Sequence, residues 1–245
     1  MKIDYINEIE NSNVYDVAQV TPITFLSKIS QKYENRIHLK REDLQPIFSF
    51  KCRGAYNKIS NLSDDDKSSG IIAASAGNHA QGVALAASKL KISAVIVMPT
   101  TTPSIKIESV KKFGVKVMLY GDSFDEAYEH ALKISDKEER VFIHPFDDPL
   151  VIAGQGTVAK EIVEQTDENP EIFFIPVGGG GLISGMSIYL KKKYPNSKII
   201  GVESEDAPTL YTSMKNGKPT TLNQVGLFVD GCAVKRIGNE TFKIS

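Results

Sequence analysis

The sequence has few of the residues that form disulfide bonds or bind metals in small folds. Its 245 residues include no tryptophan and only two cysteines, Cys52 and Cys232, which are distant along the chain. A disulfide framework and a zinc cage both need closely and regularly spaced cysteines. We therefore expect neither, and we expect the protein to work in the reducing cytoplasm.

Long apolar runs and an excess of either charge are also missing. The densest hydrophobic stretches, such as 94–98, are far shorter than the roughly 18 apolar residues of a membrane span. Residues 1–13 are polar and have no apolar core of a secretory signal. Lys plus Arg number 29 against 30 Asp plus Glu, whereas nucleic-acid binders need a cationic excess. We expect no membrane and no nucleic-acid partner.

The sequence signatures of hydrolases and metalloproteases are absent too. There is no GxSxG elbow and no HExxH helix. The histidines His38, His130 and His144 show no ligand spacing. We predict no metal, and we interpret His79 as a packing residue.

From residue 70 onward, short runs rich in Val and Ile alternate with longer amphipathic stretches, which predicts an α/β fold around parallel strands. Thr102 and Ser123 are predicted helix caps. The segment 145–149, with two prolines and two aspartates, is the predicted crossing between domains. The predicted strands are 71–75, 92–98, 115–120, 141–144, 171–177 and 197–203, and the predicted helices are 80–90, 103–113, 124–137, 153–164, 182–193 and 235–245.

Four consecutive glycines, Gly178, Gly179, Gly180 and Gly181, lie between an apolar strand and a helix. Ordering them costs more backbone entropy than a simple connection requires. They allow bare N–H groups to approach an anion at the positive end of the helix, and phosphate is the obvious anion. The spacing fits neither the GxGxxG fingerprint nor a P-loop, and a tight strand-to-helix turn is the alternative interpretation.

Lys51 stands out among the lysines by its position. It lies near aromatic residues and just after Ser49, which is a plausible helix cap. A helix N-terminus and partial burial both lower the pKa of an amine. A lysine so placed can react as a neutral amine and form a Schiff base.

The segment Ser75, Ala76, Gly77, Asn78 lies at the end of a predicted strand, where parallel sheets bind ligands. Its hydroxyl, amide and backbone N–H groups could hold a carboxylate and a ring oxygen. Simple helix capping by Ser75 or Asn78 is the alternative. A reactive lysine, a phosphate cradle and a polar loop together suit a cofactor with an aldehyde and a phosphate, and pyridoxal 5′-phosphate meets that description.

Five ordered motifs carry a resemblance to a known family. They read LKREDLQP (39–46), SFKCRGAYNK (49–58), SAGNHAQGVA (75–84), IAGQGT (152–157) and PVGGGGLISG (176–185). The chain resembles threonine dehydratase, also called threonine ammonia-lyase, and residues 225–242 look more like the biosynthetic than the catabolic form. The resemblance implies a tryptophan-synthase-beta-like (fold type II) pyridoxal enzyme with two open, mostly parallel sheets. It also implies a large domain of 1–63 and 148–245 and a small domain of 64–147.

The resemblance implies a role for each candidate residue. Lys51 holds the cofactor and takes the α proton, and Asn78 bonds the cofactor's phenolic oxygen. Gly178 to Gly181 and Leu182 bind the phosphate, and Ser75 with Ala76 and Gly77 receives the substrate carboxylate. The implied reaction converts L-threonine to 2-oxobutanoate and ammonia, and L-serine to pyruvate, as the first step of isoleucine biosynthesis in a homo-oligomer.

Two departures from the family limit this expectation. The family's ring-nitrogen serine and its isoleucine-binding regulatory domain lie beyond residue 245. We therefore expect exposed apolar surface, and weak or no activity of this chain alone. Related serine racemases bind a cation here, but only Glu203 matches, and Thr209 replaces the expected Asp.

Three alternatives stay open. One is a serine racemase or serine dehydratase of the same fold. Another is a nicotinamide-dependent oxidoreductase, favoured by a glycine-rich turn with Glu203 about 20 residues further on. The third is a non-catalytic fragment that keeps the fold.

Overall fold

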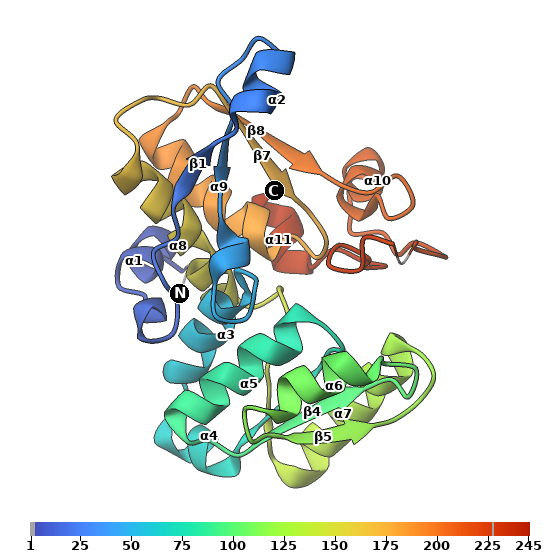
Figure 1. Cartoon of the computed structure of the whole chain (residues 1–245). Coiled ribbons are helices and arrows are strands. Elements are labelled where there is room, and N and C mark those ends of the chain that lie inside the picture. Colours follow the sequence, from blue (N-terminus) through green and yellow to red (C-terminus); the bar gives the residue numbers. More distant parts are fainter. Residues whose placement is uncertain (1–2, 227) are drawn as a thin grey trace.

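The computed structural model describes residues 3–226 and 228–245 (Figure 1). The strands are β1 (Ile23–Phe25), β2 (His38–Lys40), β3 (Ile71–Ala74), β4 (Ala94–Met98), β5 (Lys116–Leu119), β6 (Val141–Phe142), β7 (Ile172–Pro176) and β8 (Lys198–Val202). The helices are α1 (Tyr5–Glu10), α2 (Ser27–Lys32), α3 (Lys51–Ser60), α4 (Asp64–Ser69), α5 (Asn78–Leu90), α6 (Ser104–Lys111), α7 (Phe124–Glu138), α8 (Pro149–Gln165), α9 (Gly181–Lys193), α10 (Thr209–Asn216) and α11 (Asn239–Ile244).

A four-stranded parallel sheet in the order β5-β4-β3-β6 forms the lower part of the molecule in Figure 1. Every residue of β3 and β4 is buried. One face, which includes Ile71 and Ile96, packs against α3 and α5. The other face, which includes Ile72 and Val97, packs against Ala127 and its neighbours in α7. Helices therefore cover this sheet on both sides, as its continuous apolar strands require.

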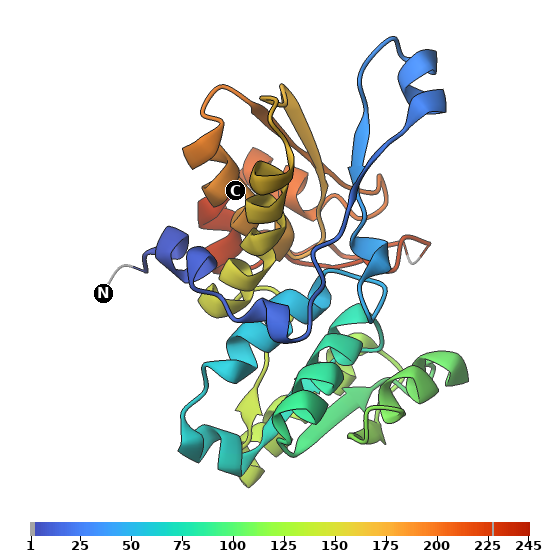
Figure 2. The same cartoon turned by 60° about the vertical axis from the view of Figure 1, so that its left-hand side comes forward.

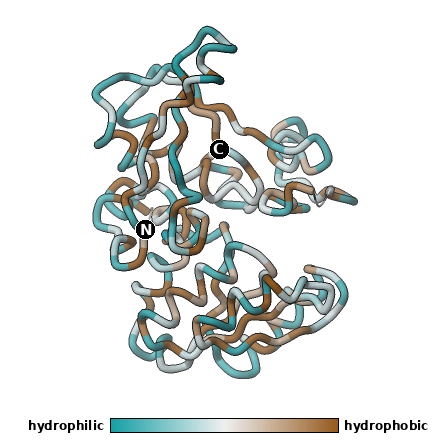
Figure 3. Tube along the Cα trace, in the orientation of Figure 1, coloured by the Kyte–Doolittle hydropathy of each residue, from teal (hydrophilic) through white to brown (hydrophobic). Residues whose placement is uncertain are grey.

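A second parallel pair, β7 and β8, lies in the upper part of the molecule. Phe173 and Ile175 point into a core built with α8 and α9. Large apolar side chains on the other face are exposed, namely Ile172, Phe174, Ile200 and Val202. Figure 3 shows the hydrophobic stretches that run along both strands. The exposed apolar surface expected from the sequence is therefore present.

A third, antiparallel pair joins β1 to β2, and α2 lies between them along the chain. Figure 2 shows α2 at the far end of this hairpin, projecting from the rest of the molecule. None of the helices within the described residues combines the length and the hydropathy needed to cross a membrane.

Helix α3 lies between α5 and α8, and glycines make these contacts close. A Cβ on Gly82 of α5 would lie 2.7 Å from the backbone oxygen of Lys51. A Cβ on Gly154 of α8 would lie 2.7 Å from the Cα of Gly54. Real Cβ atoms do not approach backbone so closely, so any side chain at either position would push α3 away.

Every strand and helix predicted from residue 71 onward is present, with ends moved by a few residues, and α10 is a helix that the sequence did not predict. Ser123 is the predicted cap of α7, and it forms a capping box with Glu126. The cap predicted at Thr102 is wrong, because Pro103 occupies the N-cap position and leaves Thr102 one residue too early. The last helix starts at Asn239 instead of 235. The predicted domain boundaries stay a prediction, and β3 to β6 all fall within 64–147.

Candidate active site

Lys51 is the first residue of α3, and its surroundings favour a neutral amine. Its Nζ donates a hydrogen bond of 2.8 Å to the backbone oxygen of Pro145. The ring centroid of Phe50 lies 5.7 Å from the same nitrogen. Burial lowers the pKa of Lys51 to about 8. The predicted lowering of this pKa is therefore confirmed, and burial is its main cause.

The helix cap predicted at Ser49 is wrong. Phe50 occupies the N-cap position of α3, and no side chain caps the helix there. Ser49 lies one residue too early for its hydroxyl to reach the free N–H groups of the first turn. The Oγ of Ser49 is buried and has no hydrogen-bond partner among the described residues.

The glycines 178–181 connect β7 to α9, and Gly180 is the N-cap with φ of +92°. That left-handed conformation favours glycine. A Cβ on Gly179 would lie 2.2 Å from the ring of Phe146, so only a glycine fits beneath this ring. Among the described residues, no backbone hydrogen bond is donated by the N–H groups of Gly178 to Leu182. The loop therefore presents a row of unused donors at the start of a helix.

The polar segment 75–78 follows β3, as predicted. Gly77 is the N-cap of α5, and no side chain caps this helix. The capping alternative for Ser75 and Asn78 is therefore wrong. The Oγ of Ser75 instead accepts a hydrogen bond of 3.2 Å from the N–H of Gly77, next to Ala76. Asn78 is exposed.

His79 is buried, and its Nε2 lies 2.9 Å from the backbone oxygen of Ile143. Burial and the charge of Lys51 lower the pKa of His79 to about 3, so the ring is neutral and its Nε2–H donates to this oxygen. The predicted packing role of His79 is confirmed.

The segment 143–146 contacts Lys51, the glycine loop and His79, which directly follows the polar segment 75–78. Ile143 accepts the bond from His79, beside Asn78 at the start of α5. Pro145 accepts the bond from Lys51, and Phe146 covers Gly179 and Gly181. The structure thus brings the lysine and the glycine loop to one short stretch of chain, to which the residue after the polar segment is also bonded.

Comparisons with known proteins decide the family. Residues 14–245 match the family profile described as "Pyridoxal-phosphate dependent enzyme". The chain belongs to this family of pyridoxal-phosphate dependent enzymes.

Two curated relatives are biosynthetic L-threonine dehydratases named IlvA. The protein of Pasteurella multocida is 52% identical over 241 residues, which are 98% of this chain and 47% of the relative. The protein of Escherichia coli is 46% identical, with the same two shares of 98% and 47%. The chain therefore spans about half the length of the curated relatives it matches.

Solved structures agree with this family. The processed form of threonine deaminase isoform 2 from Solanum lycopersicum matches with a TM-score of 0.95 and 50% identity, over 97% of this chain and 69% of that chain. Maize serine racemase matches with a TM-score of 0.93 and 32% identity, over 99% of this chain and 73% of that chain. The predicted fold class and the resemblance to threonine dehydratase are confirmed.

The site fits the family's cofactor by its own chemistry. Pyridoxal 5′-phosphate needs an amine for its aldehyde and donors for its phosphate. Lys51 supplies an amine with a pKa of about 8, and the glycine loop supplies the unused N–H groups. Both contact the segment 145–146.

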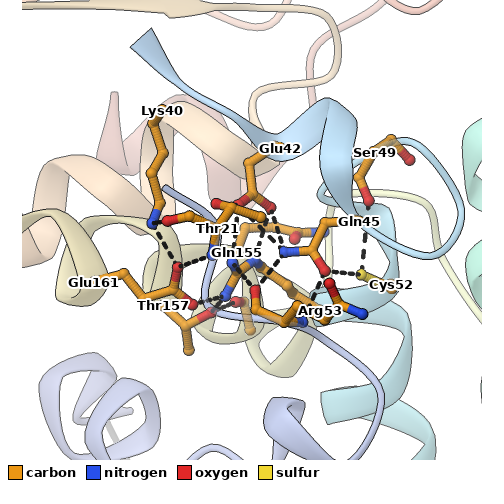
Figure 4. A network of polar contacts seen from close by, with 12 residues as sticks. Thr21, Lys40, Glu42, Gln45, Ser49, Cys52, Arg53, Gln155, Thr157 and Glu161 are labelled. Atoms are coloured by element: carbon orange, nitrogen blue, oxygen red, sulfur yellow. Dashed lines mark hydrogen bonds and ion pairs between the residues drawn. The ribbon is translucent and has the colours of Figure 1, made fainter. Parts of the chain in front are cut away.

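A buried ionic network is centred on Arg53, two residues after Lys51 (Figure 4). The fully buried Arg53 donates two hydrogen bonds of 2.8 Å to Glu42 and one of 2.6 Å to Glu161. Glu161 also accepts a bond of 2.6 Å from Lys40. Burial raises the pKa of the Glu161 carboxyl, but Arg53 and Lys40 outweigh this and leave the pKa below its usual value.

Sequence reasoning missed this network, although a signal was present. Arg53 stands among the small or apolar residues Cys52, Gly54 and Ala55, and such a run covers all sides of a helix and indicates a buried one. A buried guanidinium requires carboxylate partners. Those partners come from α8 and from the segment before α3, and their distance along the chain hid them.

Glu203 acts as a helix cap. Its Oε1 accepts hydrogen bonds from the hydroxyl of Thr209 and the N–H of Leu210, and its Oε2 accepts one from the N–H of Tyr211. The backbone oxygen of Gly178 lies 3.2 Å from the same Thr209 hydroxyl and shares its one hydrogen with Glu203. Within residues 3–226 and 228–245, no three His, Cys, Asp or Glu side chains are grouped as a metal would need.

Proposed function

We propose that this chain carries the cofactor site of a pyridoxal 5′-phosphate-dependent threonine dehydratase. The proposed reaction converts L-threonine to 2-oxobutanoate and ammonia. The observation that carries the proposal is the half-buried Lys51, whose Nζ has a pKa of about 8 and lies 2.8 Å from the Pro145 oxygen beside the glycine loop. The biosynthetic threonine dehydratases at 46% and 52% identity support the choice of substrate.

Each predicted site residue keeps a role in this proposal. Lys51 would hold the cofactor's aldehyde carbon, and Asn78 would bond its phenolic oxygen. Ser75, Ala76 and Gly77 would receive the carboxylate of the substrate. The unused N–H groups from Gly178 through Gly179, Gly180 and Gly181 to Leu182 would bind the phosphate. The pyridine ring supplies an electron sink for the negative charge that develops at the α carbon.

The residues of the chain would move the protons. A neutral Lys51 amine can take the α proton as a general base, and a pKa of about 8 leaves part of it neutral near neutral pH. The β hydroxyl of threonine then leaves as water. The released enamine takes up one water and loses ammonia, so that threonine yields 2-oxobutanoate and ammonia with no net change in water.

The same chemistry on L-serine would give pyruvate, and we include serine as a second substrate. The match to maize serine racemase, at 32% identity, favours a site that also admits serine. We further propose a cytoplasmic homo-oligomer that serves isoleucine biosynthesis. The low cysteine content supports the reducing compartment, and the word "biosynthetic" with the name IlvA supports the pathway.

Borohydride reduction tests the cofactor site. The purified chain is mixed with pyridoxal 5′-phosphate, reduced and digested, and the modified peptide is identified by mass spectrometry. We expect the label on Lys51, with no label in Lys51→Ala and full label in Lys89→Ala, whose side chain is exposed on α5. Label spread over surface lysines would contradict the proposal.

An activity assay tests the substrate. 2-Oxobutanoate formation from L-threonine and pyruvate formation from L-serine are measured for this chain and for the full-length gene product. We expect activity in the full-length product, with threonine preferred, and weak or no activity in this chain alone. Racemisation of serine without release of ammonia would favour the racemase alternative.

A further inference from the structure

The predicted crossing segment contains two adjacent aspartates that fix different helices. The carboxylate of Asp148 accepts hydrogen bonds from the first turn of α8 and forms an ion pair of 2.8 Å with Lys58 of α3. Asp147 reaches the other way, to α11, about 90 residues later in the chain. The same segment contacts Lys51 through Pro145 and the glycine loop through Phe146.

Asp147 holds the N-terminus of α11 with both carboxylate oxygens. Its Oδ2 accepts a hydrogen bond of 2.9 Å from the N–H of Asn239. Its Oδ1 accepts bonds of 2.8 Å from Glu240 and 3.2 Å from Thr241. A Cβ on Gly238 would lie 2.3 Å from Oδ1, so this approach requires glycine there. A carboxylate at this position satisfies N–H groups that have no partner within the helix and complements the helix dipole.

The turn that Asp147 holds lies directly on the glycine loop. The hydroxyl of Thr241 donates a hydrogen bond of 2.8 Å to the backbone oxygen of Gly179. The N–H of Gly238 lies 3.3 Å from the same oxygen. A Cβ on Gly180 would lie 2.8 Å from the Cβ of Thr241. The position of α11 thus determines the orientation of the Gly179 carbonyl.

A fixed carbonyl also fixes the next N–H group. The peptide bond is planar and trans, so the N–H of Gly180 points opposite to the carbonyl of Gly179. That N–H is one of the donors at the start of α9 that have no backbone acceptor among the described residues. Turning the Gly179 carbonyl away from Thr241 would also turn this donor.

We propose that Asp147 is a positioning residue for the phosphate of the cofactor, acting through Thr241 and the Gly179–Gly180 peptide. This inference rests on the proposed function, because it takes the glycine loop to be the phosphate site. Removing the carboxylate frees α11, the Gly179 carbonyl loses its two donors, and the phosphate-binding N–H groups lose their common direction.

The test compares two ligands that differ only in the phosphate. Dissociation constants for pyridoxal 5′-phosphate and for pyridoxal are measured by absorption titration of the chain, because both carry the aldehyde that reacts with Lys51. We expect Asp147→Ala to raise the dissociation constant of pyridoxal 5′-phosphate about tenfold, which is the size of effect expected from losing a charged helix cap. The dissociation constant of pyridoxal should change less than about twofold, which is the small effect of removing a charge that does not act on the ligand.

Further variants separate positioning from general support of the fold. Thr241→Val removes only the bond to Gly179 and should show the same phosphate-selective loss. Asp147→Asn keeps one acceptor oxygen and should recover most of the affinity. Asp148→Asn is the matched control, because it weakens the α8 cap and the Lys58 pair without touching α11, and should leave the ratio of the two constants unchanged.

Each outcome decides the proposal. Equal weakening of both ligands by Asp147→Ala and Thr241→Val, or no weakening by either, would overturn it. If Asp147→Ala does not fold, as judged by thermal unfolding, Thr241→Val and Asp147→Asn decide alone. A wild-type chain that binds pyridoxal and pyridoxal 5′-phosphate equally also overturns it while sparing the role of Lys51. Binding of neither ligand would refute the proposed function as well.

Discussion

The two parallel sheets of this protein are made of similar strands, but, among the residues that the structure describes, helices cover both faces of only one of them. In β3 and β4 every residue is buried, and helices pack on either side. In β7 burial alternates along the strand, and Phe174 is 67% exposed. Strands of nearly the same apolar composition therefore lie in different environments. Strand composition predicts pairing in a sheet, whereas the elements that pack on it decide how much apolar area leaves water.

The first prediction breaks the link between the two regions. Arg53 is on α3, which packs on the covered sheet, and Glu161 is on α8, which packs on the partly bare one. Arg53→Met should lower the free energy of unfolding by about 3–5 kcal/mol, because it removes the ion-pair partner of Glu42 and leaves the buried Glu161 with Lys40 alone. Urea denaturation measures this loss.

An exposed ion pair is the control for this prediction. Arg41 pairs with Asp43 near the surface. Arg41→Met should cost less than about 1 kcal/mol. A similar cost for both variants would show that the buried network does not hold the two regions together.

The second prediction contrasts one side chain from each sheet. Ile72 of β3 is 0% exposed, so Ile72→Ala should cost about 2–4 kcal/mol through lost burial and a cavity. Phe174→Ala on the bare face of β7 should cost less than about 1 kcal/mol, since little area leaves water there. Equal costs in thermal or urea unfolding would contradict the difference in packing.

The third prediction concerns the bare face itself. Clustered apolar side chains on an open surface bind hydrophobic dyes. The double variant Phe174→Ser with Ile200→Ser should reduce dye fluorescence by about half or more. Ile105→Ser changes an isolated side chain that is 78% exposed on α6, and should leave the signal nearly unchanged. Equal reductions would show that the dye does not report on this face.

The fourth prediction affects reactivity and leaves the fold unchanged. Burial lowers the pKa of Lys51 from 10.5 to about 8, and only the neutral amine attacks an aldehyde. The rate of pyridoxal capture should rise with pH up to about 8 and then level off. Stopped-flow absorbance measures this profile, and a rate that keeps rising beyond pH 10 would indicate an ordinary lysine.

The sequence was sufficient where a signal lay within a few residues. Helix α5 follows from its apolar spacing, and the Ser123 capping box lies within one turn. Lys51 and the glycine loop were recognised from local context. The caps predicted at Ser49 and Thr102 failed because the backbone starts each helix one residue later. A propensity for capping does not determine where a helix begins.

Features that depend on distant residues were not visible in the sequence. The Arg53 network joins Lys40, Glu42 and Glu161, and the Asp147 contacts with α11 span more than 90 positions. The contact between the Phe146 ring and Gly179 also joins segments that are distant along the chain. Each is a contact between segments whose approach depends on how the sheets and helices pack.

By itself, the amino-acid sequence determined the chemistry that this protein can offer: a lysine at a helix start, glycines before another helix, and strands rich in Val and Ile. These are local properties, because side-chain type and backbone freedom act over a few residues. Only the tertiary structure decided that Lys51 meets Pro145, that Asp147 holds α11 and that one sheet face stays bare. Burial and long-range hydrogen bonds arise only when distant segments pack together, and that packing is what lowers the pKa of Lys51.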